Sequence, residues 1–271
     1  MNDSSDIVPL VLAAGQGKRM QSSLPKVMHF VCDKPMLEHV LDLCRKISTR
    51  PAAVLINAEQ TSIRQYLEEN FPHVAICVQK KPRGTADAVA SFAALFKNAL
   101  KPSYVDSELV SGSEQNAAFA LILYGDVPGI NIETLNRFIA FSQEKNSDVA
   151  LIGMMAKNPT GYGRIFLGED GNIRKIIEER DCTDVERKIQ LCNTGVFLVR
   201  VKVLFEILSE ILPNNAQNEY YLTDCVPIAL KKNLKVDVFE TFGYEEFLGV
   251  NDPEQLKQVE AIMRKNICVE S

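Results

Sequence analysis

The chain has 271 residues, of which 46% are hydrophobic, enough to fill the core of one large α/β domain or two small ones. Its formal net charge is -5 and its acidic and basic residues are mixed, so it lacks the clustered positive charge of a nucleic-acid-binding groove. The seven cysteines form no C-x-x-C pair and the three histidines form no ligand spacing, which argues against a disulfide framework and against a zinc site.

The amino terminus, MNDSSD, is polar and acidic, unlike a secretory signal. The apolar runs are strand-sized and fall well short of the ~20 residues that cross a bilayer. We therefore expect a cytoplasmic protein that acts on small molecules and binds neither nucleic acid nor a membrane. The sequence does not predict an oligomeric state.

Short apolar runs alternate with helical patterns through the first 156 residues. Five runs are predicted to be strands: Ile7–Ala13, Ala52–Asn57, Val74–Gln79, Phe119–Tyr124 and Asp148–Met155. Residues 35–47 carry apolar side chains at helical spacing. Continuous apolar strands separated by amphipathic helices predict an α/β fold with a parallel sheet covered on both faces.

The first predicted strand runs into LVLAAGQGKRMQSSLPK, residues 10–26, which has the glycines and cations of a phosphate-binding loop. It fits neither the dinucleotide fingerprint, because Met20 stands at the third glycine position, nor the Walker A spacing. Gly15 and Gly17 would let backbone N–H groups approach an anion, and Arg19 and Lys26 would supply charge. Either cation alone is more typical of a solvated turn, but the whole pattern with its downstream Pro-Lys favours phosphate.

Polar residues also follow two later strands, where ligands bind in an open parallel sheet. Gln79 ends one strand and is followed by Arg83-Gly84-Thr85, and FALILY is followed by Gly125-Asp126. A carboxylate at the end of a fully apolar strand is costly without a partner, and Mg²⁺ is the partner expected at a nucleotide site. The local pattern leaves open a helix N-cap or a turn aspartate before Pro128.

The next segments are less regular. Residues 101–116, KPSYVDSELVSGSEQN, are polar and aperiodic and are predicted to be a mobile surface insertion at the edge of the sheet opposite the site. After about Ala156, glycine-rich, hairpin-like segments that include Cys192–Val199 predict a second lobe of shorter mixed strands. A helix near Tyr221–Leu230, a strand at 235–240 and a helix from Pro253 to about Met263 complete the chain.

Capping patterns account for some polar residues in this half. Asp252 before Pro253, with Gln255 at the third helical position, fits an N-cap, which leaves Asn251 freer to face a ligand. Thr223, just before a helix, has a similar capping interpretation.

Together these motifs resemble a known family. LAAGQGKRM with SLPK is similar to the signature of sugar-phosphate nucleotidyltransferases. The segments VQKKPRGTADAV, LILYGDVP, NPTGYGRI, IIEERD, CNTGVFLV, NEYYLTD and GVND follow in the order found in N-acetylglucosamine-1-phosphate uridylyltransferase domains. The resemblance covers nearly the whole chain.

The resemblance implies a Rossmann-like, mostly parallel sheet with a smaller mixed-strand sugar-binding lobe. It implies Mg²⁺-dependent transfer of UMP from UTP to N-acetylglucosamine 1-phosphate, which gives pyrophosphate and UDP-N-acetylglucosamine for cell-envelope amino sugars. By motif position, the nucleotide-binding residues would be Leu12, Ala13, Ala14, Gly15, Gln79, Gly84 and Thr85. The sugar-binding residues would be Tyr124, Gly163, Glu178, Asn193, Tyr221 and Thr223. Arg19 and Lys26 would be the catalytic cations, and Asp126 and Asn251 the Mg²⁺ ligands.

The resemblance also implies a division of the chain into a nucleotide-binding half at 1–156, a sugar-binding lobe at 157–250 and a closing helix at 251–271. Bifunctional members of the family continue into a left-handed β-helix acetyltransferase, and this sequence stops after its final helix, so we expect a stand-alone uridylyltransferase or a fragment. Ala86-Asp87 departs from the usual Gly-His of the family and puts the shape of the base pocket in question.

Two alternatives remain at this point. One is the same reaction with another sugar phosphate or another base. The other is a catalytically silent protein that binds nucleotide sugars as a sensor; the presence of all four predicted phosphate-binding and metal-binding residues argues against it.

Overall fold

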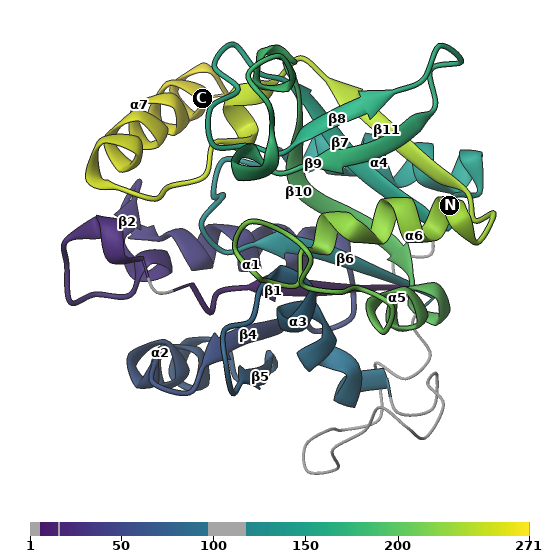
Figure 1. The fold of residues 1–271 in the computed structure, drawn as a ribbon. Helices are drawn as coiled ribbons and strands as arrows, with labels where there is room; N and C mark the ends of the chain where they lie inside the picture. The colour runs from purple at the N-terminus through teal and green to yellow at the C-terminus, as the bar shows by residue number, and fades with distance from the viewer. Residues whose placement is uncertain (1–5, 16, 97–117, 271) are drawn as a thin grey trace.

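A mostly parallel sheet forms the centre of the computed structural model, which describes residues 6–15, 17–96 and 118–270 (Figure 1). The predicted insertion at 101–116 lies outside the described residues. Across the sheet the strands run in the order β11 (Val236–Thr241), β7 (Val149–Met155), β10 (Leu191–Arg200), β6 (Phe119–Tyr124), β1 (Ile7–Leu12), β4 (Ala53–Asn57) and β5 (Ala75–Gln79). The five strands predicted in the first half are confirmed to within one residue at each end.

The strand β10 corrects one expectation. Its segment was expected among the short strands of a second lobe, but it spans ten residues in the middle of the sheet, antiparallel to both β6 and β7. The other neighbouring strands along this path pair in parallel. The second lobe is instead built on a hairpin of β8 (Arg164–Leu167) and β9 (Ile173–Ile177), which joins the sheet where Arg164 pairs with Cys192.

Helices cover both faces of the sheet, as the continuous apolar strands predict. One face packs against α1 (Met36–Ile47), α2 (Thr61–Asn70) and α4 (Ile132–Lys145). The other packs against α3 (Thr85–Ala90), the 3-10 helix η4 (Ser91–Phe96), α5 (Val201–Leu208) and α6 (Cys225–Lys231). Strand β1 shows the reason, because Val11 faces the first set while Leu10 and Leu12 face the second.

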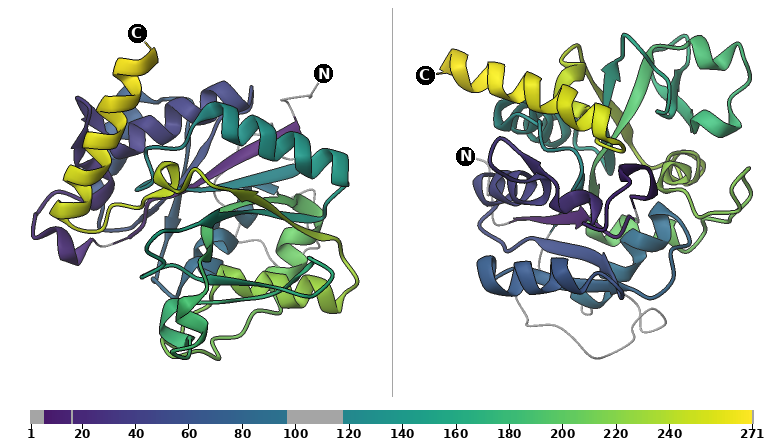
Figure 2. Two further views of the ribbon diagram at one scale, coloured as in Figure 1. Left: turned by 90° about the horizontal axis from the view of Figure 1, so that it is seen from above. Right: turned by 90° about the vertical axis from the view of Figure 1, so that its left-hand side faces the viewer.

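The last helix, α7 (Pro253–Glu270), extends beyond the predicted end at Met263. It packs beside a two-stranded ribbon, β2 (Phe30–Val31) and β3 (Lys34–Pro35), through a small core that includes Val31 and Val259 (Figure 2). The helix predicted near residue 221 divides into a 3-10 turn, η9 (Leu222–Asp224), and α6.

Further 3-10 turns lie in the connections. They are η2 (Lys18–Met20), η3 (Lys26–Met28), η7 (Glu179–Asp181), η8 (Glu186–Lys188) and η10 (Tyr244–Phe247). Within the described parts of the chain, none of the helices has the length and hydrophobicity needed to traverse a bilayer.

Candidate active site

A cavity of about 370 Å³ lies at the carboxyl ends of β1, β5 and β6. This is where the topology of an open parallel sheet places ligands, because the loops after neighbouring strands diverge there. Every residue that the resemblance assigned to nucleotide binding lines this cavity: Leu12, Ala13, Ala14, Gly15, Gln79, Gly84 and Thr85. The phosphate-loop prediction and the Gln79–Thr85 prediction therefore converge on one site.

A second cavity, of about 180 Å³, adjoins the first under the β8–β9 hairpin. Four residues expected to bind the sugar line it: Tyr124, Gly163, Glu178 and Asn193. Tyr124 and Asp126 line both cavities, so two ligands placed in the two cavities would meet beside these side chains. Thr223 does not line the second cavity but contacts Glu178, which does. Tyr221 lines neither cavity, and its hydroxyl donates to Gln217 Oε1 at 2.8 Å.

Three polar side chains from distant parts of the chain meet where the cavities join. Lys26 Nζ, on η3, forms an ion pair with Asp126 Oδ2 and donates to Asn251 Oδ1 at 3.1 Å. Only 13% of the Lys26 side chain and 14% of the Asp126 side chain are exposed, so little solvent screens the pair. Asp126 lies in a turn and not at the N-cap of a described helix, and its carboxylate has a partner in the site.

Asn251 is free to join this cluster because its neighbour forms the helix cap. Asp252 Oδ1 accepts from the backbone N–H of Gln255 at 2.9 Å and from that of Glu254 at 3.1 Å, as the sequence predicts. Gln255 Oε1 in turn accepts from the backbone N–H of Asn251, the residue before the cap, at 2.8 Å. The cap holds Asn251 with its side-chain oxygen toward Lys26.

The donor set of this cluster suits Mg²⁺. Among the described residues there is no group of three or more His, Cys, Asp and Glu side chains that would enclose a metal ion. A carboxylate oxygen of Asp126 and the amide oxygen of Asn251 nevertheless converge on one cation, the Lys26 ammonium. Mg²⁺ takes oxygen ligands and is commonly held by one or two protein groups together with substrate phosphates. These two residues fit that pattern.

Gly17 also has a steric role that the sequence did not predict. Its backbone is left-handed, with φ of 58°, and a Cβ atom there would lie 2.6 Å from Lys26 Cβ. The missing side chain therefore makes room for the stem of Lys26. Arg19, on η2, is exposed and does not line either cavity, so the structure does not bring the two predicted catalytic cations together.

Glu178 lines the second cavity and is hydrogen-bonded to Thr223, which does not. The Thr223 hydroxyl donates to Glu178 Oε1 at 3.0 Å and does not cap a helix as its sequence position suggested. Burial raises the pKa of the Glu178 carboxyl above its ordinary value of 4.5, and the hydroxyl opposes that shift only in part. The same surroundings raise the pKa of the Tyr124 phenol, mainly through burial and next through the nearby Glu178 carboxylate.

A bulge in β10 aims Asn193 into the second cavity. The register of β10 with β7 shifts between Asn193 and Phe197, and Gly195 inside the bulge has φ of 83°. The Gly195 backbone N–H donates to Asn193 Oδ1 at 3.1 Å, which leaves the Asn193 amide nitrogen free to donate to a ligand. A Cβ at Gly195 would lie 2.5 Å from Tyr124 Cε2, so the glycine also sets the position of that ring.

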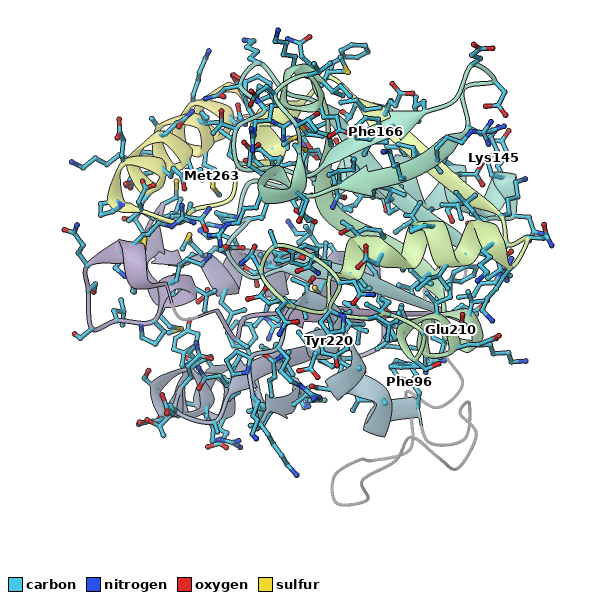
Figure 3. The ribbon with its side chains drawn as sticks, viewed as in Figure 1. Phe96, Lys145, Phe166, Glu210, Tyr220 and Met263 are labelled. Atoms are coloured by element: carbon cyan, nitrogen blue, oxygen red, sulfur yellow. The ribbon has the colours of Figure 1, made fainter. Side chains whose placement is uncertain are left out.

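Sequence reasoning missed two residues that support the site. Gln60, 8% exposed, donates from Nε2 to the backbone oxygen of Gly15 at 3.3 Å and so holds the first loop. The position of Gln60 just after β4, at the edge of the sheet where ligands bind, is the sequence signal that could have identified it. Tyr220 lies over the start of α3, where its backbone accepts from Ala86 N–H at 2.8 Å and donates to the Arg83 oxygen at 2.8 Å (Figure 3). No local pattern indicated that pairing.

Comparisons with known proteins point to one family. The family model described as nucleotidyl transferase matches residues 8–244. The chain is 34% identical over 258 residues to the bifunctional protein GlmU of Bacillus licheniformis, covering 95% of this chain and 52% of the relative. It is 36% identical over 263 residues to GlmU of Brevibacillus brevis, covering 97% and 53%, and 38% identical over 259 residues to GlmU of Azoarcus sp., covering 96% and 52%.

The chain thus spans about half the length of the curated relatives it matches. A solved structure of UDP-glucose pyrophosphorylase in complex with UDP-glucose superposes with a TM-score of 0.71 at 16% sequence identity, covering 96% of this chain and 98% of that one. At that identity the likeness shows the shared fold, and it confirms the expected Rossmann-like arrangement.

Proposed function

The chain belongs to the nucleotidyl transferase family, and from this premise we propose that it transfers UMP from UTP to N-acetylglucosamine 1-phosphate, giving UDP-N-acetylglucosamine and pyrophosphate. The observation that carries the proposal is the pair of adjoining cavities with Tyr124 and Asp126 common to both. A nucleoside triphosphate in the first and a sugar phosphate in the second would place their phosphates beside Asp126. The identity to relatives named as bifunctional GlmU supports the choice of these two substrates.

The reaction requires no general base. A phosphate oxygen of the sugar phosphate is already an anionic nucleophile; it forms a bond to the α-phosphorus of UTP as the bond to the bridging oxygen breaks, and that electron pair leaves with pyrophosphate. The work of the protein is to align two anions that repel each other and to stabilise charge that develops on the α-phosphate and the leaving group. This fits two cavities whose charged lining residues are Lys26, Asp126, Glu178 and Glu219, with no histidine among the lining residues.

Lys26, Asp126 and Asn251 supply the charge for this step. Asp126 and Asn251 would hold Mg²⁺, which when bound neutralises phosphate charge and orients the triphosphate. Lys26 has a flexible stem, so its ammonium can leave these two oxygens for a phosphate oxygen once substrate is present. Arg19 lies outside both cavities, and we propose it as a second cation for the triphosphate.

The second cavity suits an amino-sugar phosphate. Glu178 presents a carboxylate that already accepts from Thr223 and has capacity left for a sugar hydroxyl. The Asn193 amide nitrogen has no hydrogen-bond acceptor among the described residues. Gly163 leaves space beside Glu178, because a Cβ atom at residue 163 would lie 3.3 Å from Glu178 Oε2. We propose that these groups hold the sugar ring and that Tyr124 packs beside it.

The functional division of the chain follows from this placement. We propose that residues 1–156 bind the nucleotide, 157–250 bind the sugar and 251–271 close the site. Asn251 contributes its oxygen from the start of the last segment. Strand β10 belongs to the second segment although it lies in the middle of the sheet, so the division is one of function rather than of layers.

The test is a substrate matrix with pyrophosphate release as the readout. UTP, dTTP and CTP would each be combined with the 1-phosphates of glucosamine, N-acetylglucosamine and glucose, in Mg²⁺. We expect the highest kcat/KM for UTP with N-acetylglucosamine 1-phosphate. A higher value for another pair would assign the site to a different nucleotide or sugar, and no release from any pair would favour the catalytically silent alternative.

A further inference from the structure

Asp87, in the first turn of α3, connects two side chains at the wall of the larger cavity. Its Oδ2 accepts from Gln79 Nε2 at 2.9 Å. Its other oxygen, Oδ1, accepts from Arg83 Nη2 at 2.6 Å and from Arg83 Nε at 3.1 Å. The two carboxylate oxygens therefore have separate partners: Gln79, which lines the cavity, and Arg83, whose side chain is 60% exposed.

This contact fixes which way round the Gln79 amide lies. An ionised carboxylate only accepts hydrogen bonds, so the NH₂ end of the amide must face Asp87. Gln79 is 5% exposed, lines the cavity and, within the part of the chain that the structure describes, has no other side-chain hydrogen bond. Its Oε1 is thus an acceptor left for a ligand.

We propose that Asp87 is a positioning residue that makes this site prefer a pyrimidine carrying an N3–H donor, uracil or thymine, over cytosine. The inference rests on the proposed function, which places the nucleotide base in this cavity beside Gln79. Uracil presents N3–H, which the Gln79 oxygen accepts. Cytosine presents a bare N3 acceptor, which would face that oxygen with no proton between them. An unpaired buried polar group of this kind is costly enough to discriminate between ligands.

Arg83 determines which side-chain atom of residue 87 faces Gln79. Because the guanidinium only donates, it would keep the amide oxygen of an Asp87→Asn side chain on its own side, at the position of Oδ1. The new NH₂ group would then replace Oδ2 opposite Gln79. Gln79 would have to turn its own oxygen toward residue 87 and present its NH₂ group to the base, which suits N3 of cytosine and opposes N3–H of uracil.

The experiment measures kcat/KM for UTP and for CTP with N-acetylglucosamine 1-phosphate and Mg²⁺, by pyrophosphate release. We expect the UTP-to-CTP ratio to fall at least about 30-fold in Asp87→Asn, the scale of one satisfied hydrogen bond exchanged for a buried mismatch. Asp170→Asn is the matched control, because Asp170 also pairs with an arginine four residues on, at 2.7 Å, in the exposed β8–β9 turn. Its ratio should equal that of the unmodified protein.

A double variant separates positioning from a general structural effect. Without the guanidinium, as in Arg83→Met with Asp87→Asn, the new amide can rotate and accept from Gln79 again, so the ratio should recover toward that of the unmodified protein. A ratio within about twofold of the unmodified value in Asp87→Asn, with UTP turnover intact in the unmodified protein, would overturn the inference and leave the proposed function standing. Absence of turnover with UTP and with CTP in the unmodified protein would instead overturn the proposed function.

Discussion

At the scale of single residues, the site depends on contacts between side chains that are far apart in sequence. Lys26 and Asp126 are separated by 100 positions, and Lys26 and Asn251 by 225. Each residue was identified from its own strand or helix end, but local pattern left Asp126 equally compatible with a turn. The ion pair and its low exposure supply what the pattern lacked, since a buried carboxylate is stable only with a partner.

Removal of that carboxylate gives the first prediction. In Asp126→Ala we expect kcat to fall by ~10²-fold or more, because one preorganised electrostatic contact to the reacting phosphates is lost. Steady-state pyrophosphate release at saturating substrate measures it. Asp42→Ala is the matched control, because Asp42 also pairs with a lysine, Lys34, but has a 32% exposed side chain and lies outside both cavities. Normal turnover both in Asp126→Ala and in Arg19→Ala would contradict the proposed phosphate site.

Glu178 gives a prediction about pH. Its folded-state pKa is raised above the ordinary 4.5 by burial, so the carboxyl becomes protonated at a higher pH than an exposed glutamate. As the pH falls through that raised value, the carboxylate loses acceptor capacity, and KM for the sugar phosphate should rise while KM for UTP stays level. Glu178→Gln should raise KM for the sugar phosphate at all pH values and remove this dependence. An unchanged pH profile in that variant would show that another group titrates.

Protonation of Glu178 should have opposite effects on folding stability and on binding of the sugar phosphate. Because burial disfavours the charged form, the contribution of Glu178 to folding is most favourable below its unfolded-state pKa and declines as the pH rises through the folded-state value. Burial of this carboxyl in the second cavity thus costs stability in its charged form, which is typical of a group retained for binding.

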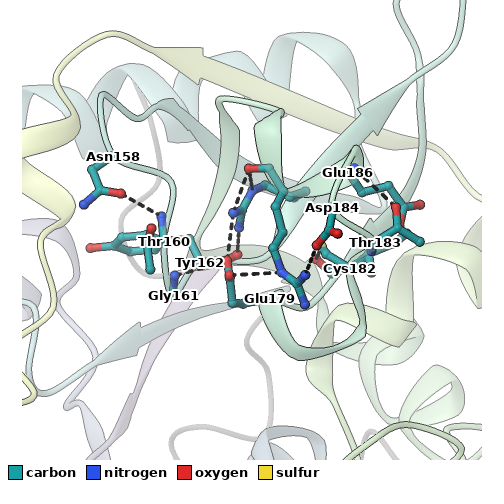
Figure 4. Close-up of polar contacts among 12 residues, drawn as sticks. Asn158, Thr160, Gly161, Tyr162, Glu179, Cys182, Thr183, Asp184 and Glu186 are labelled. Carbon is teal, nitrogen blue, oxygen red and sulfur yellow. Dashed lines mark hydrogen bonds and ion pairs between the residues drawn. The ribbon is translucent and has the colours of Figure 1, made fainter.

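At the scale of secondary-structure elements, the second lobe, built on the β8–β9 hairpin, is organised around Arg164 in β8. This side chain is 1% exposed; it donates to the backbone oxygens of Tyr162 and Arg187 and forms an ion pair with Glu179 at 2.7 Å. Glu179 also accepts from the Gly161 backbone at 3.2 Å (Figure 4). The network joins β8, η7 and η8 and thereby places Gly163 and Glu178 on the cavity wall.

Substitution of this buried arginine gives a prediction about stability. Arg164→Met should lower the free energy of unfolding by about 3 kcal/mol, because it leaves backbone carbonyls and the Glu179 carboxylate without their donor. Equilibrium unfolding in urea measures it. Arg174→Met, in the neighbouring strand, is the control: its side chain is 55% exposed and pairs only with exposed Asp170, so its effect should stay below about 0.5 kcal/mol. Equal effects of the two substitutions would contradict the structural role of Arg164.

The strands show how much of the fold could be predicted from sequence. The apolar runs of β1, β4, β5, β6 and β7 are local signals, and they located those strands to within one residue at each end. Strand β10 has polar residues and a glycine in its middle, CNTGVFLV, and its pairing with β6 and β7 is a long-range contact. The predicted segment Cys192–Val199 agrees with β10 to within one residue at each end, but its place in the sheet depends on these long-range pairings and was not predicted.

At the scale of the whole molecule, one sheet with helices on both faces holds loops from the first strand, the sugar lobe and the start of α7 around one pair of cavities. The order of the motifs identified the family, and four of the motifs extend beyond the end of a strand, β1, β5, β6 or β9. Sequence could not show that Lys26 lies between Asp126 and Asn251, that Asp87 orients Gln79, or that Arg19 lies outside the cavities. These depend on how distant loops pack.

Ligand binding should stabilise the whole fold. UTP with Mg²⁺ at ~100 times its dissociation constant adds about 2.7 kcal/mol to the stability of a protein that binds it only when folded. We expect a rise in melting temperature of roughly 5 °C or more for a chain of this size, measured by thermal unfolding. GTP, which carries a purine in place of the pyrimidine, serves as the control. An equal rise with GTP would contradict a base-specific cavity.

The most direct test of the account is identification of the products formed from UTP and N-acetylglucosamine 1-phosphate, with and without Mg²⁺. Phosphorus NMR follows both phosphates of the product and pyrophosphate in one sample. We predict that UDP-N-acetylglucosamine and pyrophosphate appear in equal amounts, and only when Mg²⁺ is present. Release of pyrophosphate without the nucleotide sugar, or no reaction in either condition, would contradict the assignment of the two cavities.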